Sequence, residues 1–383
     1  MNKKHKLLFF TKMDFGVAAN GGIKKKVFAQ ARAFRAHGFE VDVLSFSHQI
    51  VQIEGQNTSL TFPHSGSWSR LRFLFGGFLS VIDIKEYDYL YVRHFLTNPL
   101  FLWLLYRVKK AHPSIKIFME IPTFPYRFEF GKMPFTKRLE LWVDERCTDY
   151  FKYYIERIVT FSSKTHIFNI PTIRTDNGID IDIEQFTLLN KAPYDGQTLH
   201  LLGLANVQIW HGIDRFLEGM KVYYSKKPTQ TVQLHVVGSG DEIPRLQTLT
   251  TKYGLQDAVF FHGFLSGTEL DAMFRRCHLG VGSCGMHRIN VAKGETSALK
   301  SREYAARGLP FVIGYEDRGF PENYPYLLQI DADETPVDMH RLVYFYEDLQ
   351  QNYPHYNLEM NQYAKDNLTW QAKLKNVVDA FLE

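Results

Sequence analysis

Residues 294–303 combine charged side chains with the start of a helix in a way that suits a phosphorylated ligand. Glu295 lies in a loop, Lys300 falls in the first helical turn, and Glu303 follows about two turns beyond Glu295. Backbone N–H groups at a helix start bind anions, and a lysine adds positive charge, so these groups can hold a diphosphate. Glu295 can accept hydrogen bonds from sugar hydroxyls, and Glu303 from the diol of a ribose.

The residues between the two glutamates complete this candidate donor site. Ser297, Ala298 and Leu299 precede Lys300, and either Thr296 or Ser297 can cap the helix through its hydroxyl oxygen. The alternative interpretation is an ordinary surface helix with an exposed charge pair. The chemistry of this segment alone does not separate the two.

Two glycine-containing turns are further candidates for contact with a ligand. Gly21 and Gly22 precede a predicted helix, and Gly238 and Gly240 follow a predicted strand. Glycine lets a ligand approach the backbone closely, but each motif alone is equally typical of a tight turn. The second turn lacks the third glycine of a dinucleotide fingerprint, which argues against an oxidoreductase.

Several other classes of chemistry are not expected. The Asp180-x-Asp182 pair is explained by turn chemistry, so we predict no metal site and no cofactor. The net charge of +4 lacks the dense basic stripe of a nucleic-acid-binding protein. The three cysteines have no disulfide or metal spacing, which favours a reducing compartment such as the cytoplasm.

Short apolar runs alternate with amphipathic helical stretches through both halves of the 383-residue chain. This alternation predicts an α/β protein with two Rossmann-like, doubly wound domains. Expected strands include 6–11, 41–46, 87–92, 115–120, 200–204, 233–237 and 279–282, and expected helices include 22–37, 139–154, 213–224, 298–307 and 363–382.

A polar stretch at 190–197 that contains Pro193 and Gly196 is the predicted interdomain linker. We therefore expect domains at 1–190 and 198–362, with a final helix at 363–383 that packs on the first domain. Ligands of such sheets bind at the carboxyl ends of the strands, so the motifs should lie in strand-to-helix loops and the cleft between the domains.

The order of the motifs resembles that of the large family of retaining glycosyltransferases with the GT-B fold, which includes bacterial capsule and exopolysaccharide transferases. The resemblance covers nearly the whole chain. It rests on Asn20-Gly21-Gly22, Asn177-Gly178-Ile179-Asp180, residues 210–215, Val237-Gly238-Ser239-Gly240, Glu295 with Glu303 and Gly308-Leu309-Pro310, and Asn367-Leu368-Thr369-Trp370. It implies that the second domain binds a nucleotide-sugar donor, with a UDP-sugar expected, and that the first binds the acceptor.

The chain departs from the family pattern where relatives place an arginine and a lysine beside the donor phosphates. Asn206 and His211 stand at those positions. The resemblance therefore assigns them to the donor site but leaves the phosphate charge mainly to Lys300. Arg302, Arg288 and Lys293 are the reserve cations.

Polar residues at two expected strand ends are acceptor-side candidates. Glu120 stands near the place where relatives carry a histidine, so it can orient the acceptor hydroxyl or act as a base; a salt-bridged carboxylate is the alternative. Arg93 and His94 end the preceding strand, and a packed histidine is the alternative there.

Two segments of the first domain, 69–78 and 126–138, mix basic residues with Phe, Leu and Met. Such mixtures suit contact with the inner leaflet of a membrane, although loop packing is the alternative. The three lysines at 24–26 fit a solvated helix face or anionic lipid equally well. No apolar stretch is long enough to span a bilayer, and the start of the chain does not resemble a signal peptide.

The expected activity is metal-independent transfer of a sugar from a nucleotide diphosphate to a hydroxyl of a glycan or lipid-linked acceptor, with Glu295, Lys300 and Glu120 as the catalytic candidates. Two alternatives stay open. A nucleotide-sugar 2-epimerase has the same architecture, and a non-catalytic partner subunit would explain the missing Arg/Lys pair.

Overall fold

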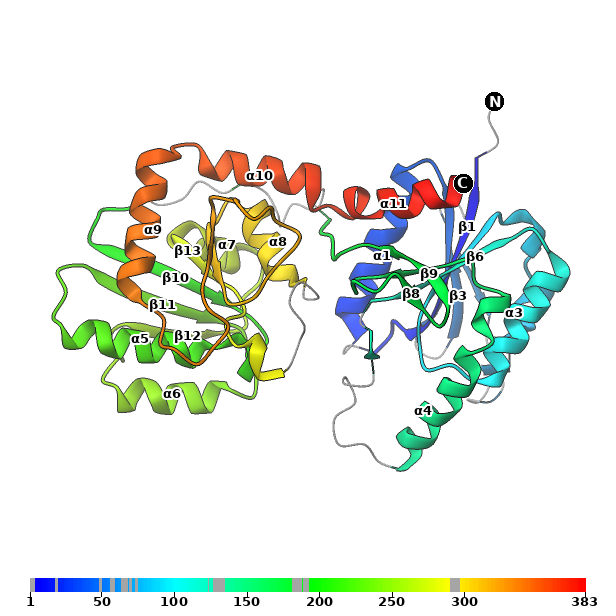
Figure 1. Ribbon diagram of the computed structural model, residues 1–383, viewed down its shortest axis with the longest axis horizontal. Coiled ribbons are helices and arrows are strands. Elements are labelled where there is room, and N and C mark those ends of the chain that lie inside the picture. The colour runs from blue at the N-terminus through cyan, green and yellow to red at the C-terminus, as the bar shows by residue number, and fades with distance from the viewer. Residues whose placement is uncertain are drawn as a thin grey trace. The chain divides into compact units, whose positions relative to one another are not determined.

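The computed structural model describes residues 4–17, 20–47, 50–55, 59–62, 68, 71–72, 75–122, 124–126, 135–180, 188, 193–289 and 297–383. The chain forms two compact units (Figure 1). Unit 1 comprises residues 1–176 together with 370–383, and unit 2 comprises residues 177–369. No helix among the described residues is both long and apolar enough to cross a membrane.

Unit 1 is built on a nine-stranded sheet of order β4-β3-β2-β1-β5-β6-β7-β9-β8. The central strands are parallel, as expected for strands that alternate with helices along the chain. They are β1 (Lys6–Asp14), β2 (Glu40–Ser47), β5 (Tyr89–Arg93), β6 (Lys116–Ile121), β7 (Arg157–Thr160) and β9 (Ile170–Arg174). The antiparallel strands β3 (Ile50–Glu54), β4 (Ser59–Phe62) and β8 (His166–Ile167) extend the edges and were not expected from the sequence.

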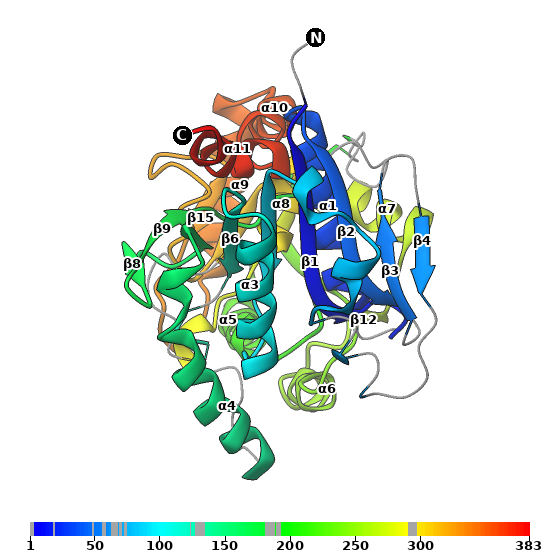
Figure 2. The same ribbon diagram turned by 90° about the vertical axis from the view of Figure 1, so that its right-hand side faces the viewer.

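Helices cover both faces of this sheet. The helices α1 (Gly21–Ala36) and α11 (Trp370–Leu382) pack on one face, and α3 (Pro99–Ala111) and α4 (Phe135–Thr148) lie on the other (Figure 2). Short 3-10 turns at Gly77–Ser80, Ile84–Glu86 and Phe151–Tyr153 complete the unit. Phe381 of α11 is fully buried, stacked on Tyr89 at 4.6 Å between ring centres and edge-on to Phe118 at 4.5 Å.

The single final helix predicted at 363–382 is wrong. The structure has α10 (Tyr356–Asn367) in unit 2 and α11 in unit 1, with a break at Leu368 and Thr369. The break is where the chain is tied to another segment, because Ile179 N donates to Leu368 O at 2.9 Å and Ile179 bridges Thr369. A carbonyl oxygen that accepts a hydrogen bond from another segment does not accept the backbone bond that would continue the helix.

The first crossing between the units lies at Asp176–Asn177, earlier than the linker predicted at 190–197. Asn177 is already hydrogen-bonded to another residue of unit 2. Its backbone N donates to Ser297 Oγ at 3.1 Å, and its side-chain Nδ2 donates to Ser297 O at 2.7 Å. On the other side, Asp176 pairs with Lys373 of α11, at 3.5 Å.

Unit 2 contains a six-stranded parallel sheet of order β12-β11-β10-β13-β14-β15. The strands are β10 (Thr198–Leu204), β11 (Thr231–Val237), β12 (Val259–Gly263), β13 (Leu279–Val281), β14 (Phe311–Ile313) and β15 (Leu327–Gln329). The helices α5 (Ile213–Ser225) and α6 (Ile243–Lys252) lie on one face, and α7 (Gly267–Arg276) and α8 (Leu299–Ala306) on the other (Figure 1). The 3-10 turns Ile209–His211 and Met286–Ile289, with α9 (Met339–Asn352) and α10, complete it.

A chain of hydrogen-bonded imidazoles crosses three adjacent strands of this sheet. His200 Nδ1 lies 3.1 Å from His235 Nε2, and His235 Nδ1 lies 3.0 Å from His262 Nε2. Burial lowers the pKa of all three, and for His235, which also faces Arg276, to about 3. The folded protein therefore holds these rings neutral, whereas the unfolded chain takes up protons near pH 6.5.

This difference predicts acid-sensitive stability. Because the folded pKa values lie below the unfolded ones, the stabilisation is complete above about pH 6.5 and is lost as the pH falls towards the folded values. His235→Phe keeps the ring stacked on Phe260 but removes one titrating group, so its unfolding free energy should fall less steeply between pH 6 and 4, by about 1.4 kcal/mol per pH unit.

Urea unfolding curves recorded across this pH range measure the slope of the unfolding free energy against pH. The exposed His355 replaced by Gln serves as the control and should keep the wild-type slope. Equal slopes for wild type and His235→Phe would contradict the neutral imidazole chain.

Candidate functional site

The carboxyl edge of the unit 2 sheet has a topological switch point beside β10. Its neighbours are β11, which follows it in sequence, and β13, which the chain reaches only after returning from β12. The loops after β10 and β13 therefore diverge to opposite faces of the sheet, which leaves a crevice where such sheets bind ligands. Residues 205–212 and 282–289 form these two loops.

Main-chain hydrogen bonds join the two loops. Cys284 N donates to His211 O, and Gly285 N donates to Trp210 O, both at 3.0 Å. The buried Arg215 of α5 adds a side-chain bond from Nη1 to Cys284 O at 2.5 Å. The position of His211 relative to the β13 loop is therefore set by backbone atoms.

His211 is a buried, neutral imidazole at this edge. Burial is the main cause that lowers its pKa to about 3, and the charge of Lys300 adds to the effect. Its Nδ1 accepts from Gln208 N at 2.9 Å, so the ring proton is assigned to Nε2. His211 consequently supplies a neutral N–H donor where the family pattern has a cation.

Lys300 lies in the first turn of α8, close enough to His211 and Cys284 for their charges to interact. Burial lowers the pKa of Lys300 to about 7. Among the described residues, no acidic side chain pairs with its ammonium group. Burial thus disfavours the charge of this ammonium, and no carboxylate of the described residues neutralises it, which is the state in which a cation gains most from an anionic ligand.

The start of α8 adds free backbone donors. The expectation that Thr296 or Ser297 caps this helix is not fulfilled for Ser297, because Ala298 is the N-cap and no side chain caps it. Ser297 instead receives the two hydrogen bonds from Asn177. Within the described part of the chain, the N–H groups of Leu299 and Lys300 have no partner, so they are available to an anion.

The glutamates and the reserve cations have different environments. Glu295, Thr296 and Lys293 lie outside the described residues. Glu303 pairs with Arg307 of the same helix at 3.4 Å. Arg302 is fully buried in a pair with Asp317 and lies over the Phe320 ring. It is a structural residue and not the phosphate ligand that the sequence offered as a reserve.

Arg288, the other reserve cation, is also neutralised. It pairs with Asp214 through Nη1 at 2.9 Å and with Glu334, and it donates to Ile209 O. These contacts hold the β13 loop against the β10 loop. Lys300 is therefore the cation of this edge, within the described residues, that no carboxylate neutralises.

Gly238 and Gly240 are required by close backbone packing. A Cβ on Gly238 would lie 1.8 Å from Ala205 O, and one on Gly240 would lie 2.1 Å from Val207 O. Both residues also have positive φ, 123° and 150°. The loop after β11 thus packs directly on the loop after β10, where Asn206 is exposed.

A separate cluster of charges lies in unit 1. Glu120, at the end of β6, is fully buried and accepts from Gln30 Nε2 at 2.9 Å and Arg93 Nη1 at 2.8 Å, with Lys26 Nζ 3.6 Å away. Arg93 and Lys26 outweigh burial and lower the pKa of this carboxyl. Both oxygens are engaged, so the structure supports the salt-bridge alternative and gives no support to a free catalytic base.

Other unit 1 candidates lie around this cluster. Lys26 is not part of a solvated face, since it lies over the rings of Phe161 and Trp370 at 4.5 and 5.1 Å. His94 packs on Tyr126, its buried Nε2 has no hydrogen-bond partner among the described residues, and burial lowers its pKa to about 3. Gly21 and Gly22 open α1, with free space on the side where a Cβ would lie.

The sequence interpretation missed two contributors to the unit 2 site. Cys284 is fully buried between the loops, and Asn177 holds the residue before α8. Cys284-Gly285 begins two residues after the predicted strand 279–282, which was a usable signal for a strand-end loop. The contact between Asn177 and Ser297 spans 120 residues and has no local signature.

Comparison with known proteins is consistent with this geometry. A family model described as "Glycosyl transferases group 1" matches residues 165–324, and this range includes the loops described above at the carboxyl edge of the unit 2 sheet. No curated protein matches the chain.

Solved structures match over nearly the full chain. A glycosyltransferase from Rickettsia africae has a TM-score of 0.64 at 11% identity and covers 99% of this chain and 98% of its own. HepE from Anabaena, in complex with UDP, has a TM-score of 0.62 at 13% identity, with 98% and 99% covered. Starch synthase IV from Arabidopsis thaliana, bound to ADP and acarbose, has a TM-score of 0.62 at 9% identity, with 99% of each chain covered. At these identities the likeness establishes the fold, which is GT-B, with two Rossmann-like α/β domains.

The Arg302–Asp317 pair generates a stability prediction. Asp317→Asn leaves the buried guanidinium without its counter-charge, so the unfolding free energy should fall by about 3–5 kcal/mol. Glu316→Gln removes the partner of the exposed Arg318 next to it and should cost no more than about 1 kcal/mol. Chemical denaturation of both variants measures the contrast, and equal stabilities would show that Arg302 does not depend on Asp317.

Proposed function

We propose that this protein is a glycosyltransferase that binds a nucleotide diphosphate sugar at the carboxyl edge of unit 2 and transfers the sugar to a hydroxyl group. The observation that carries the proposal is Lys300, which no carboxylate of the described residues neutralises, beside the N–H groups of Leu299 and Lys300, which have no partner among those residues, and close to the N–H donor of His211. These groups suit a diphosphate. The match of residues 165–324 to the glycosyltransferase model supports the reaction class.

The chemical demand of the reaction is to stabilise the leaving group. As the bond between the anomeric carbon and the phosphate oxygen breaks, negative charge grows on the diphosphate while a bond forms from the acceptor oxygen, whose proton passes to the released diphosphate or to solvent. Fixed donors in a poorly hydrated site stabilise such charge without reorganising. In this proposal Lys300 and the N–H groups of α8 hold the diphosphate, and no metal ion is needed.

The remaining donor contacts follow from position. Glu303 is proposed to accept hydrogen bonds from a ribose diol, in exchange for or beside its pair with Arg307. Glu295 is proposed to position the sugar. Complexes of HepE with UDP and with UDP-glucose favour a UDP-sugar donor here, although starch synthase IV holds ADP.

The acceptor is proposed to be a glycan or a lipid-linked saccharide bound by unit 1, with the anomeric configuration retained. Arg93 and His94 at the end of β5 are its candidate contacts. The three cysteines are buried and form no disulfide, in keeping with the proposed cytoplasmic location.

The low pKa of Lys300 makes donor binding dependent on pH. Only the protonated lysine attracts the diphosphate, and a nucleotide sugar has no phosphate that titrates near neutrality. The dissociation constant for UDP-glucose, or for the best-bound sugar of a panel, should therefore rise up to about tenfold per pH unit above pH 7. Calorimetry between pH 6 and 9 measures this slope.

Lys300→Arg is the matched control, because its guanidinium stays charged throughout this range and the slope should vanish. Lys300→Ala should bind weakly at every pH. A wild-type affinity that is independent of pH would remove Lys300 from the phosphate site.

The proposed donor class is tested by thermal shift with a panel of nucleotide sugars. A ligand at about 100 times its dissociation constant should stabilise by about 2.7 kcal/mol. The stabilising donor is then incubated without acceptor and followed by NMR. Stereochemical inversion of the free donor would identify an epimerase, and the absence of any stabilising donor would contradict the proposal.

A further inference from the structure

Unit 1 carries an exposed surface of apolar and basic residues that lies apart from the charge cluster around Glu120. We define the tryptophan–arginine surface by Trp68, Arg72, Leu100, Trp103, Tyr106 and Arg107. Trp68 is 73% exposed and Trp103 is 56% exposed, although large aromatic side chains normally lie inside. Exposed apolar groups gathered in this way mark interaction sites.

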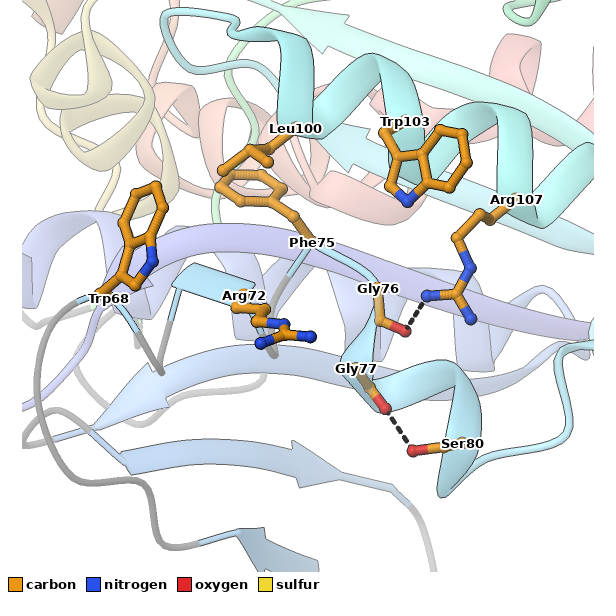
Figure 3. Close-up of a pocket in the computed structure, with 9 residues that line it drawn as sticks. All are labelled: Trp68, Arg72, Phe75, Gly76, Gly77, Ser80, Leu100, Trp103 and Arg107. Atoms are coloured by element: carbon orange, nitrogen blue, oxygen red, sulfur yellow. Dashed lines mark hydrogen bonds between the residues drawn. The ribbon is translucent and has the colours of Figure 1, made fainter.

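A cavity of about 580 Å³ lies within this surface (Figure 3). Leu100, Trp103 and Arg107 project from α3 towards the segment around Gly76, and Arg72 reaches in from the other side. Arg107 Nη1 donates to Gly76 O at 2.9 Å, which fixes its guanidinium at the cavity wall. The site thus presents two guanidinium groups and two indole rings.

The charged residues around the cavity are mainly basic. A neighbouring hollow shares Ser80, Trp103 and Arg107 with this cavity and adds Lys85 and Lys110. Its one carboxylate, Asp83, accepts from Lys85 N at 3.0 Å as the cap of a 3-10 turn. The surface therefore attracts an anionic partner.

The exposed side chains distinguish between possible partners. Val81 and Leu100 add exposed aliphatic groups beside the exposed rings, and aliphatic groups gain from an apolar partner more than from a sugar. Indole and phenol rings beside aliphatic residues, with long basic side chains at their margin, are the composition of proteins that lie at a bilayer surface. Arginine and lysine heads then meet lipid phosphates while their stems cover apolar groups.

The same side of the unit 1 sheet carries a second exposed apolar stripe. Phe135, Leu139 and Trp142 are exposed along α4, which lies with α3 on one side of the sheet (Figure 2). Residues 127–134, which the sequence also favoured for this role, lie outside the described residues.

We propose that the tryptophan–arginine surface docks unit 1 on an anionic phospholipid bilayer, with lipid phosphate groups held by Arg72 and Arg107 and with the two tryptophans inserted at the interface. Membrane docking is separate from binding of the nucleotide-sugar donor, and it would bring unit 1 close to lipid-linked molecules.

The test is co-sedimentation of the full-length protein with vesicles of 30% phosphatidylglycerol in phosphatidylcholine, compared with phosphatidylcholine alone. Binding is expected to the anionic vesicles and to weaken between 50 and 300 mM NaCl. Arg72→Gln with Lys110→Gln should weaken binding about 25-fold, at about fivefold per cation near the surface. Trp68→Ala with Trp103→Ala should abolish it.

The matched control is Phe264→Ala, since Phe264 is an equally exposed aromatic residue of unit 2 and should leave binding unchanged. Glycerol 3-phosphate at 10 mM should not release the protein, because binding needs the bilayer. Equal binding to both vesicle types, or wild-type binding by the double tryptophan variant, would overturn the proposal. Binding to a soluble acidic polysaccharide but not to vesicles would overturn it in favour of a glycan site.

No nucleotide sugar or acceptor is present in this experiment. A failure therefore leaves the glycosyltransferase proposal standing, and a failure of the donor panel leaves the membrane proposal standing.

Discussion

Main-chain atoms in the loops of unit 2 approach one another so closely that no side chain fits between them. Gly238 and Gly240 lie against the carbonyl oxygens of Ala205 and Val207, and the next loop is tied to His211 O through Cys284 N. Hydrogen bonds between backbone groups do not depend on rotamers, so this constraint fixes the loops after three strands as one body. The neutral imidazole of His211 takes its position from it.

In unit 1 the corresponding constraint is electrostatic. The buried carboxylate of Glu120 is neutralised by Arg93 and Lys26, and Lys26 also lies over the Trp370 ring. A buried charge that lost these partners would be strongly destabilising. The strand end, the first helix and the last helix of the unit are therefore coupled through one lysine side chain.

The sequence predicted both sheets well because alternating apolar strands and amphipathic helices are local signals. It also identified Lys300 correctly as a residue at a helix start. It could not predict the burial of Lys26, since three consecutive lysines carry no information about depth. Nor could it predict the break at Leu368 and Thr369, which depends on Ile179, or the loss of the expected cap at Ser297, which depends on Asn177. Those outcomes need contacts between distant segments.

The burial of Phe381 among Phe34, Tyr89 and Phe118 has a consequence for biosynthesis. These three residues are made early, but the ring that covers them belongs to α11, the last helix of the chain. During translation at about 5–20 residues per second, unit 2 can finish folding while this face of unit 1 is still open. A growing chain of this protein therefore exposes this aromatic surface until α11 has been synthesised and has packed on unit 1.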